Sequence, residues 1–162
     1  MNERQGKPRT RGITEIRGPY YTVMGKRYLE DVLETMGEYV DSLKFAAGSF
    51  SLMRRDVLKE IIETAHRYNV LVSTGGWMEY VLTQGPTAVE QYIKECKEVG
   101  FDIIELSSGF ITFPIDDWIQ LIDQVKNRED AEIVTVTLEN RNKIIQTIKE
   151  AAIEFLRLSV NT

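Results

Sequence analysis

The chain has 162 residues, of which 43% are hydrophobic and 28% are charged, proportions typical of one globular domain with a buried core. The formal net charge of -5 argues against general binding to nucleic acid, and no apolar run approaches membrane-spanning length, so we expect neither partner. Residues 1–11, MNERQGKPRTR, predict a mobile basic leader without the apolar segment of a signal peptide. A single α/β domain over residues 12–162 of a cytoplasmic protein is expected to follow.

Strand and helix patterns alternate along the chain. Strands are predicted near residues 12–16, 41–46, 70–74, 102–106 and 131–138, and apolar residues at helical spacing predict helices over 28–39, 54–69, 85–100, 114–127 and 139–158. Gly100 is expected to cap the third helix. This alternation indicates an α/β fold with a parallel sheet, whose strands look apolar on both faces, as is typical when helices cover both sides. The units predict either a small open sheet or an incomplete (β/α)8 barrel, because a complete barrel typically needs about 250 residues.

Cysteine and histidine chemistry has little support. Cys96 and His66 are the single cysteine and the single histidine of the chain. Helical spacing predicts that Cys96 is a partly buried structural thiol, and that His66 lies near a helix end, where it interacts with terminal carbonyls. The glycine-rich nucleotide motifs are also missing from the sequence.

Polar residues gather where the predicted strands end. In parallel α/β proteins the carboxyl ends of the strands form the ligand site, so these side chains are expected to meet. They are Glu15, Arg17, Lys44, Ser49, Ser73, Thr74, Glu105, Ser107 and Ser108, with Gly75, Gly76 and Glu79 just after the third strand. Two carboxylates can hold Mg2+, and a lysine can donate a proton or attract an anion. Ordinary structural roles remain open for each residue, but together they indicate a site for a small anionic substrate.

Four segments carry a family resemblance: KPRTRGITEIRGPYY, LEDVLETMGEYVDSLKFAAGSFSL, VLVSTGGWMEYVL and YIKECKEVGFDIIELSSGFITFP. In order and spacing they resemble the phosphosulfolactate synthase family, and most closely its plant-type, heat-stress-associated branch, over about residues 7–126. The resemblance implies a TIM-barrel type fold, here a partial barrel of about five parallel (β/α) units. For the synthases it implies Mg2+-dependent addition of sulfite to phosphoenolpyruvate in coenzyme M biosynthesis.

The resemblance also implies roles for particular residues. Lys44 and Glu105 match catalytic positions, and Glu79 with Glu105 would hold Mg2+. Gly75, Gly76 and Ser107 match substrate-binding positions, and we add Arg17 and Ser49 to that group from their places after strands. Lys44 would point into the barrel mouth and protonate the carbanion that forms when sulfite attacks phosphoenolpyruvate.

Two alternatives to a retained synthase activity stay open. One is a noncatalytic heat-stress-associated protein that acts by association with other proteins, and the other is an open-sheet protein that binds a small anion. Arg17 and Ser108 favour the noncatalytic alternative, because the synthases carry acidic residues near both positions. The phosphate site of barrels commonly follows strands seven and eight, so we expect little or no turnover from these five units alone. Exposed sheet edges would favour a homo-oligomer.

Overall fold

The computed structural model describes residues 4–18, 24–107, 111, 114–126 and 133–137. Its strands are β1 (Glu15–Gly18), β2 (Ser42–Phe45), β3 (Leu71–Ser73), β4 (Ile103–Ser107) and β5 (Ile133–Thr137). They form one five-stranded sheet in the order β1-β2-β3-β4-β5, and all neighbouring strands are parallel. The predicted parallel, sequential order is therefore confirmed.

Helices connect the strands. They are α1 (Lys26–Met36), α2 (Arg55–Arg67), α3 (Met78–Leu82), α4 (Pro86–Val99) and α5 (Ile115–Lys126), with 3-10 segments η1 (Gly37–Tyr39) and η2 (Ala46–Leu52). Gly100 caps α4 with a φ of 106°, as predicted. The short η2 and α3 were not expected, because neither is long enough to show a helical repeat. The helix predicted over 139–158 lies outside the described residues. Among the described helices, none is both long and apolar enough to cross a membrane.

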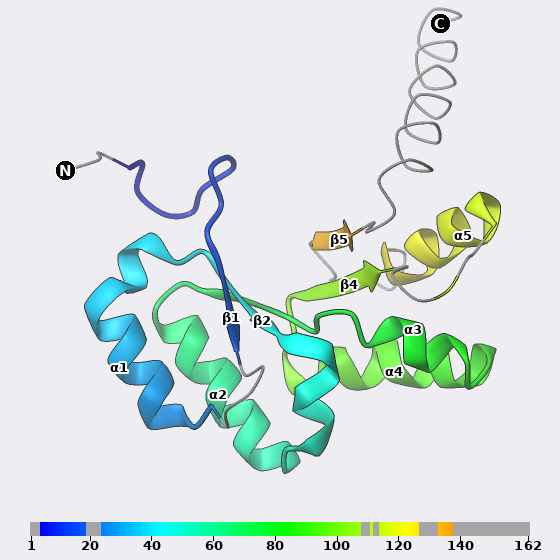
Figure 1. Cartoon of the computed structure of the whole chain (residues 1–162), viewed down its shortest axis with the longest axis horizontal. Helices are drawn as coiled ribbons and strands as arrows, with labels where there is room; N and C mark the ends of the chain where they lie inside the picture. The colour runs from blue at the N-terminus through cyan, green and yellow to red at the C-terminus, as the bar shows by residue number, and fades with distance from the viewer. Residues whose placement is uncertain (1–3, 19–23, 108–110, 112–113, 127–132, 138–162) are drawn as a thin grey trace, which may run out of the picture.

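The helices pack against one face of the sheet. Right-handed connections between sequentially ordered parallel strands place every helix on the same side, and Figure 1 shows α1 and α2 beside β1 and β2, and α3 and α4 below β4. Leu43, Phe45 and Val72 point to this side and pack in a buried cluster with residues of α1 and α2. Leu106 packs in a second cluster with residues of α3, α4 and α5. Burial of these apolar side chains holds the helices on the sheet.

The opposite face of the sheet is polar, so the expectation of strands that are apolar on both faces was wrong. Side chains alternate along a strand, and the register places Arg17, Lys44 and Ser73 side by side on the face away from the helices. Helices outside a sequential parallel sheet with a polar inner face make a TIM-barrel type fold. The barrel is not closed within the described residues, where β1 and β5 are the edge strands.

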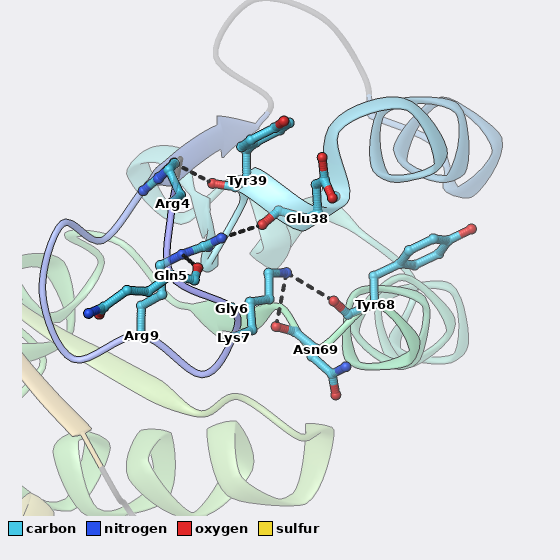
Figure 2. Close-up of a pocket in the computed structure, with 10 residues that line it drawn as sticks. Arg4, Gln5, Gly6, Lys7, Arg9, Glu38, Tyr39, Tyr68 and Asn69 are labelled. Carbon is cyan, nitrogen blue, oxygen red and sulfur yellow. Dashed lines mark hydrogen bonds between the residues drawn. The ribbon is translucent and has the colours of Figure 1, made fainter. Parts of the chain in front are cut away.

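Residues 4–9 of the predicted leader lie against the amino ends of the strands. Arg9 donates hydrogen bonds to Asp41 Oδ1 at 2.7 Å and to the Glu38 carbonyl at 2.6 Å. Figure 2 shows Lys7 reaching across a pocket of about 510 Å³ to the carbonyls of Tyr68 and Asn69, at 3.0 and 3.2 Å. Burial lowers the pKa of Lys7, although nearby Asp41 acts to raise it. The leader prediction did not include these contacts.

A second pocket of about 940 Å³ also lies at this end of the sheet. It is bordered by the first residues of four strands, Glu15, Ser42, Leu71 and Ile103. Both pockets thus lie at the amino ends of the strands. Parallel α/β proteins bind their ligands at the other end, where the carboxyl ends of the strands meet. We therefore assign them to the packing of the leader against the sheet.

Candidate active site at the carboxyl ends of the strands

A buried ion pair joins β2 and β4 at the polar mouth of the sheet. Lys44 Nζ lies against Glu105 Oε2, and the two side chains are 10% and 4% exposed. The pair spans β3, which lies between the two strands in the sheet. Ser73 is the β3 residue in register with Lys44, and its small side chain leaves room for the lysine to cross. Lys44 thus faces the mouth of the sheet, as predicted, and carries its charge beside a carboxylate.

A second acidic group reaches the same mouth from α3. Glu79 is buried, and its Oε1 accepts a 2.7 Å hydrogen bond from the hydroxyl of Ser107, the last residue of β4. A side chain at Gly76 would place its Cβ 2.7 Å from Ser107 Oγ and 3.9 Å from Glu105 Oε1. Gly76 therefore borders the Glu105 carboxylate and the Ser107 hydroxyl that donates to Glu79. The structure brings Lys44, Glu79 and Glu105 to one end of the sheet.

Glycine is required in the turn after β3 for two reasons. Gly75 has a φ of +62°, which side-chain-bearing residues rarely adopt. A Cβ at this position would also collide with the carbonyl oxygen of Phe45 at the end of β2. The turn therefore lies directly against the neighbouring strand, with its backbone close to Lys44 and the loop that follows it.

The two substrate-binding candidates added from strand position differ in their surroundings. Arg17 is exposed and is the register partner of Lys44 on β1, so its positive charge lies on the same polar face. Ser49 is half-buried in η2, and among the described residues its hydroxyl has no hydrogen-bond partner. Glu15 lies at the other end of β1, where its carboxylate accepts a 3.3 Å hydrogen bond from Ser42. It therefore does not join the mouth. Ser108 lies outside the described residues.

The mouth offers two carboxylates, from Glu79 and Glu105, as possible Mg2+ ligands. Within the described residues, no three acidic, histidine or cysteine side chains come close enough to form a metal centre of their own. Mg2+ is commonly held by one or two carboxylates, water and oxygens of the substrate, and Glu79 and Glu105 supply carboxylates at the same mouth. Because Glu105 is already paired with Lys44, the described carboxylates supply only part of a Mg2+ coordination shell, and water and substrate oxygens would have to complete it. Mg2+ therefore stays a prediction from the resemblance.

The single cysteine and histidine lie apart from this site. Cys96 is buried in the cluster between α4 and β4, and burial raises the pKa of its thiol to about 12, which agrees with the predicted structural role. His66 occupies the last turn of α2, as predicted, but its Nε2 lies 2.8 Å from Asp102 Oδ2 rather than bonding a terminal carbonyl. Asp102 also accepts the Val72 N–H at 2.7 Å, so this contact joins α2 to the start of two strands.

Known proteins that resemble this chain belong to the family that the sequence motifs indicated. Residues 2–158 match the family model described as (2R)-phospho-3-sulfolactate synthase (ComA), a longer range than the 7–126 expected from the motifs. Protein HEAT-STRESS-ASSOCIATED 32 of Arabidopsis thaliana is 43% identical over 125 residues, which is 77% of this chain and 44% of that protein.

Two archaeal proteins named phosphosulfolactate synthase are also similar. The one from Methanothermobacter thermautotrophicus is 32% identical over 120 residues, or 74% of this chain and 45% of the relative. The one from Methanocaldococcus jannaschii is 25% identical over 142 residues, or 80% of this chain and 56% of the relative. The chain therefore spans about half the length of the curated relatives that it matches. Since the family model covers nearly the whole sequence, the chain belongs to the phosphosulfolactate synthase (ComA) family.

Proposed function

We propose that the polar mouth supports the addition of sulfite to phosphoenolpyruvate, giving phosphosulfolactate, in the cytoplasm. The observation that carries this proposal is the buried Lys44–Glu105 ion pair at the carboxyl ends of the strands, in a chain of this family. A lysine held at that place can meet an anionic substrate and supply it with a proton. We therefore propose that Lys44 is the proton donor of the reaction and that Glu105 is its partner.

The proposed reaction needs one bond-forming step and one proton transfer. The sulfur of sulfite bonds to carbon 3 of phosphoenolpyruvate, and the electrons of the double bond move to carbon 2 and its carboxylate. The Lys44 ammonium then donates a proton to carbon 2, which completes phosphosulfolactate. Glu105 lies beside the ammonium and orients it toward carbon 2, and water returns a proton to Lys44 after each turnover.

Two anions must approach each other in this reaction, so positive charge at the mouth is essential. Lys44 supplies it from β2, and Arg17 adds a second positive charge from the adjacent position of β1. Mg2+, held by Glu79 and Glu105, would stabilise the negative charge that develops on the substrate carboxylate. The Gly75 N–H of the glycine turn donates to Ser73 Oγ at 3.4 Å, so the turn would offer the Gly76 N–H to an anion at the mouth.

Barrel enzymes commonly bind phosphate after strands seven and eight, and the described sheet has five strands, so we propose that these five units alone turn over slowly. Within the described residues β1 and β5 are the edge strands and pair on one side only, and we propose that the chain self-associates. Light scattering after size-exclusion chromatography would measure the mass of the assembly, and a monomer at micromolar concentration would contradict self-association.

A titration with phosphoenolpyruvate and Mg2+ tests the site directly. Calorimetry of the full chain should show binding that Lys44→Met weakens at least about tenfold, because a charged hydrogen-bonding group is worth about 1.5 to 3 kcal/mol. The matched control is Lys94→Met, which removes a lysine that is 72% exposed on α4. Equal binding by the wild type and Lys44→Met would contradict the proposed role.

The second candidate function is a noncatalytic role in heat stress through association with other proteins. It is favoured by the higher identity to the heat-stress-associated relative, 43%, than to the two named synthases, 32% and 25%. The exposed Arg17 agrees with it, since the resemblance implies an acidic residue near that position in the synthases. Under this alternative, the wild type and Lys44→Met would give equal heat tolerance in a complementation assay, and neither would form phosphosulfolactate above background.

A further inference from the structure

The sheet loses its regular hydrogen bonding between β3 and β4 at the level of the site. β3 ends at Ser73, and the register between these strands consists of the single pair Ser73 and Ile103. The Thr74 N–H still donates to the Ile103 carbonyl at 3.0 Å, but the chain then turns away at Gly75. A β4 residue beyond this point therefore lacks a β3 carbonyl opposite it. A buried backbone N–H left in this way needs another acceptor.

The side chain of Thr74 supplies that acceptor to Glu105. Thr74 Oγ1 accepts the Glu105 N–H at 3.1 Å and donates to the Gly75 carbonyl at 3.2 Å. Thr74 is fully buried, with a relative exposure of 0%. One hydroxyl thus replaces the missing strand-to-strand bond and ties β4 to the glycine turn.

This hydroxyl acts on the two parts of the site that have to stay in register. Glu105 forms the ion pair with Lys44, and the glycine turn borders the carboxylate of Glu105 on its other side. We propose that Thr74 is a positioning residue, which holds the backbone of Glu105, and through it Lys44, at a fixed place relative to the turn. The effect on catalysis rests on the proposed function, whereas the hold on Glu105 does not. Small displacements of such groups reduce rates strongly.

The test compares substitutions that remove the hydroxyl of Thr74 with one that keeps it. Thr74→Val keeps the shape and removes the hydroxyl, while Thr74→Ser keeps the hydroxyl. The matched control is Thr64→Val in α2, since Thr64 is also 0% exposed and its hydroxyl donates to the Glu60 carbonyl at 2.7 Å. This control removes an equally buried hydroxyl away from the mouth of the sheet. Thr74→Ala is a second hydroxyl-free variant, for use if the valine variant does not fold.

Two measurements are made on each full-length variant. The first is amide hydrogen exchange at Glu105 by NMR, relative to the Val72 amide, which donates to Asp102 at the other end of the strands. Loss of a buried hydrogen bond should accelerate relative exchange at Glu105 about tenfold or more in the hydroxyl-free variant. The second is the rate of phosphosulfolactate formation, which should fall about tenfold with little change in KM. Thr74→Ser should restore both values, and Thr64→Val should change neither.

The outcomes separate this inference from the proposed function. Unchanged relative exchange at Glu105 in the hydroxyl-free variants would overturn the role of Thr74, as would equal acceleration in Thr64→Val. Faster exchange with an unaltered turnover rate would show that Thr74 holds Glu105 without positioning it for the reaction, which also overturns the proposal. Faster exchange in a protein whose wild type has no turnover would remove the synthase function but leave the hold of Thr74 on Glu105 established.

Discussion

Removing either partner of the Lys44–Glu105 ion pair should destabilise the protein more than replacing both partners together. The side chains are 10% and 4% exposed, so Lys44→Met would leave the Glu105 charge buried and without its cation. Breaking a buried pair costs about 3 to 5 kcal/mol, and at this mouth, near solvent, we expect about 2 to 3 kcal/mol for Lys44→Met or Glu105→Leu alone. The double variant replaces the pair by apolar side chains and should lose about 1 kcal/mol or less.

Urea unfolding followed by circular dichroism, with wild type and all three variants at neutral pH, measures this double-mutant cycle. The expected coupling is at least about 3 kcal/mol, since the two single losses add to more than the loss of the double variant. Lys26→Met serves as a control, because Lys26 pairs with Glu60 where the side chains are 35% and 51% exposed, and it should change stability far less. If the stability losses of the two single variants add up to the loss of the double variant, the account of Lys44 and Glu105 as a coupled buried pair is refuted.

Two further effects should appear in the same unfolding assay. Gly75→Ala should lose at least about 2 kcal/mol more than Gly12→Ala, because both positions have positive φ but open space surrounds Gly12; equal losses would contradict the close approach of the turn to β2. Arg9→Ala should lose about 2 kcal/mol, because Arg9 and Asp41 form a pair with side chains 5% and 9% exposed. Burial acts to raise the pKa of Asp41, but its hydrogen bonds and Arg9 lower it overall, so the stabilisation holds at neutral pH and fades as pH falls below about 4. A loss that is the same at pH 3 and pH 7, or a similar loss in the exposed variant Arg54→Ala, would contradict this account.

The sequence was sufficient to predict the strands and the end of the sheet at which the candidate residues meet. Repeating units fix a parallel order, and parallel strands bring their carboxyl ends together, so Lys44 and Glu105 could be placed at one mouth from their positions in the chain. The family motifs placed Glu79 among the candidate site residues, although periodicity did not predict the short helix α3 that carries it. These conclusions rest on local periodicity and on a resemblance, neither of which requires knowledge of individual contacts.

Contacts that depend on where strands end could not be predicted. The hydroxyl of Thr74 bonds Glu105 because β3 leaves the sheet early, and the two residues are 31 positions apart. The bond between Ser107 and Glu79 likewise joins residues 28 positions apart, through a short helix that periodicity did not reveal. The polar face of the sheet was also not predicted. The strands are short and are flanked by apolar residues in the sequence, so the alternation of polar and apolar side chains along each strand was not recognised. Tertiary packing decides each of these features.

A single-turnover experiment tests the central claim most directly. The full chain, in excess over phosphoenolpyruvate and supplied with sulfite and Mg2+, is sampled over time, and phosphosulfolactate is measured by mass spectrometry. Enzyme in excess allows even slow chemistry to be detected. We predict slow formation of phosphosulfolactate by the wild type and by Lys94→Met, and none above the enzyme-free background by Lys44→Met. No product from the wild type, or equal product from the wild type and Lys44→Met, would contradict a synthase site built on Lys44.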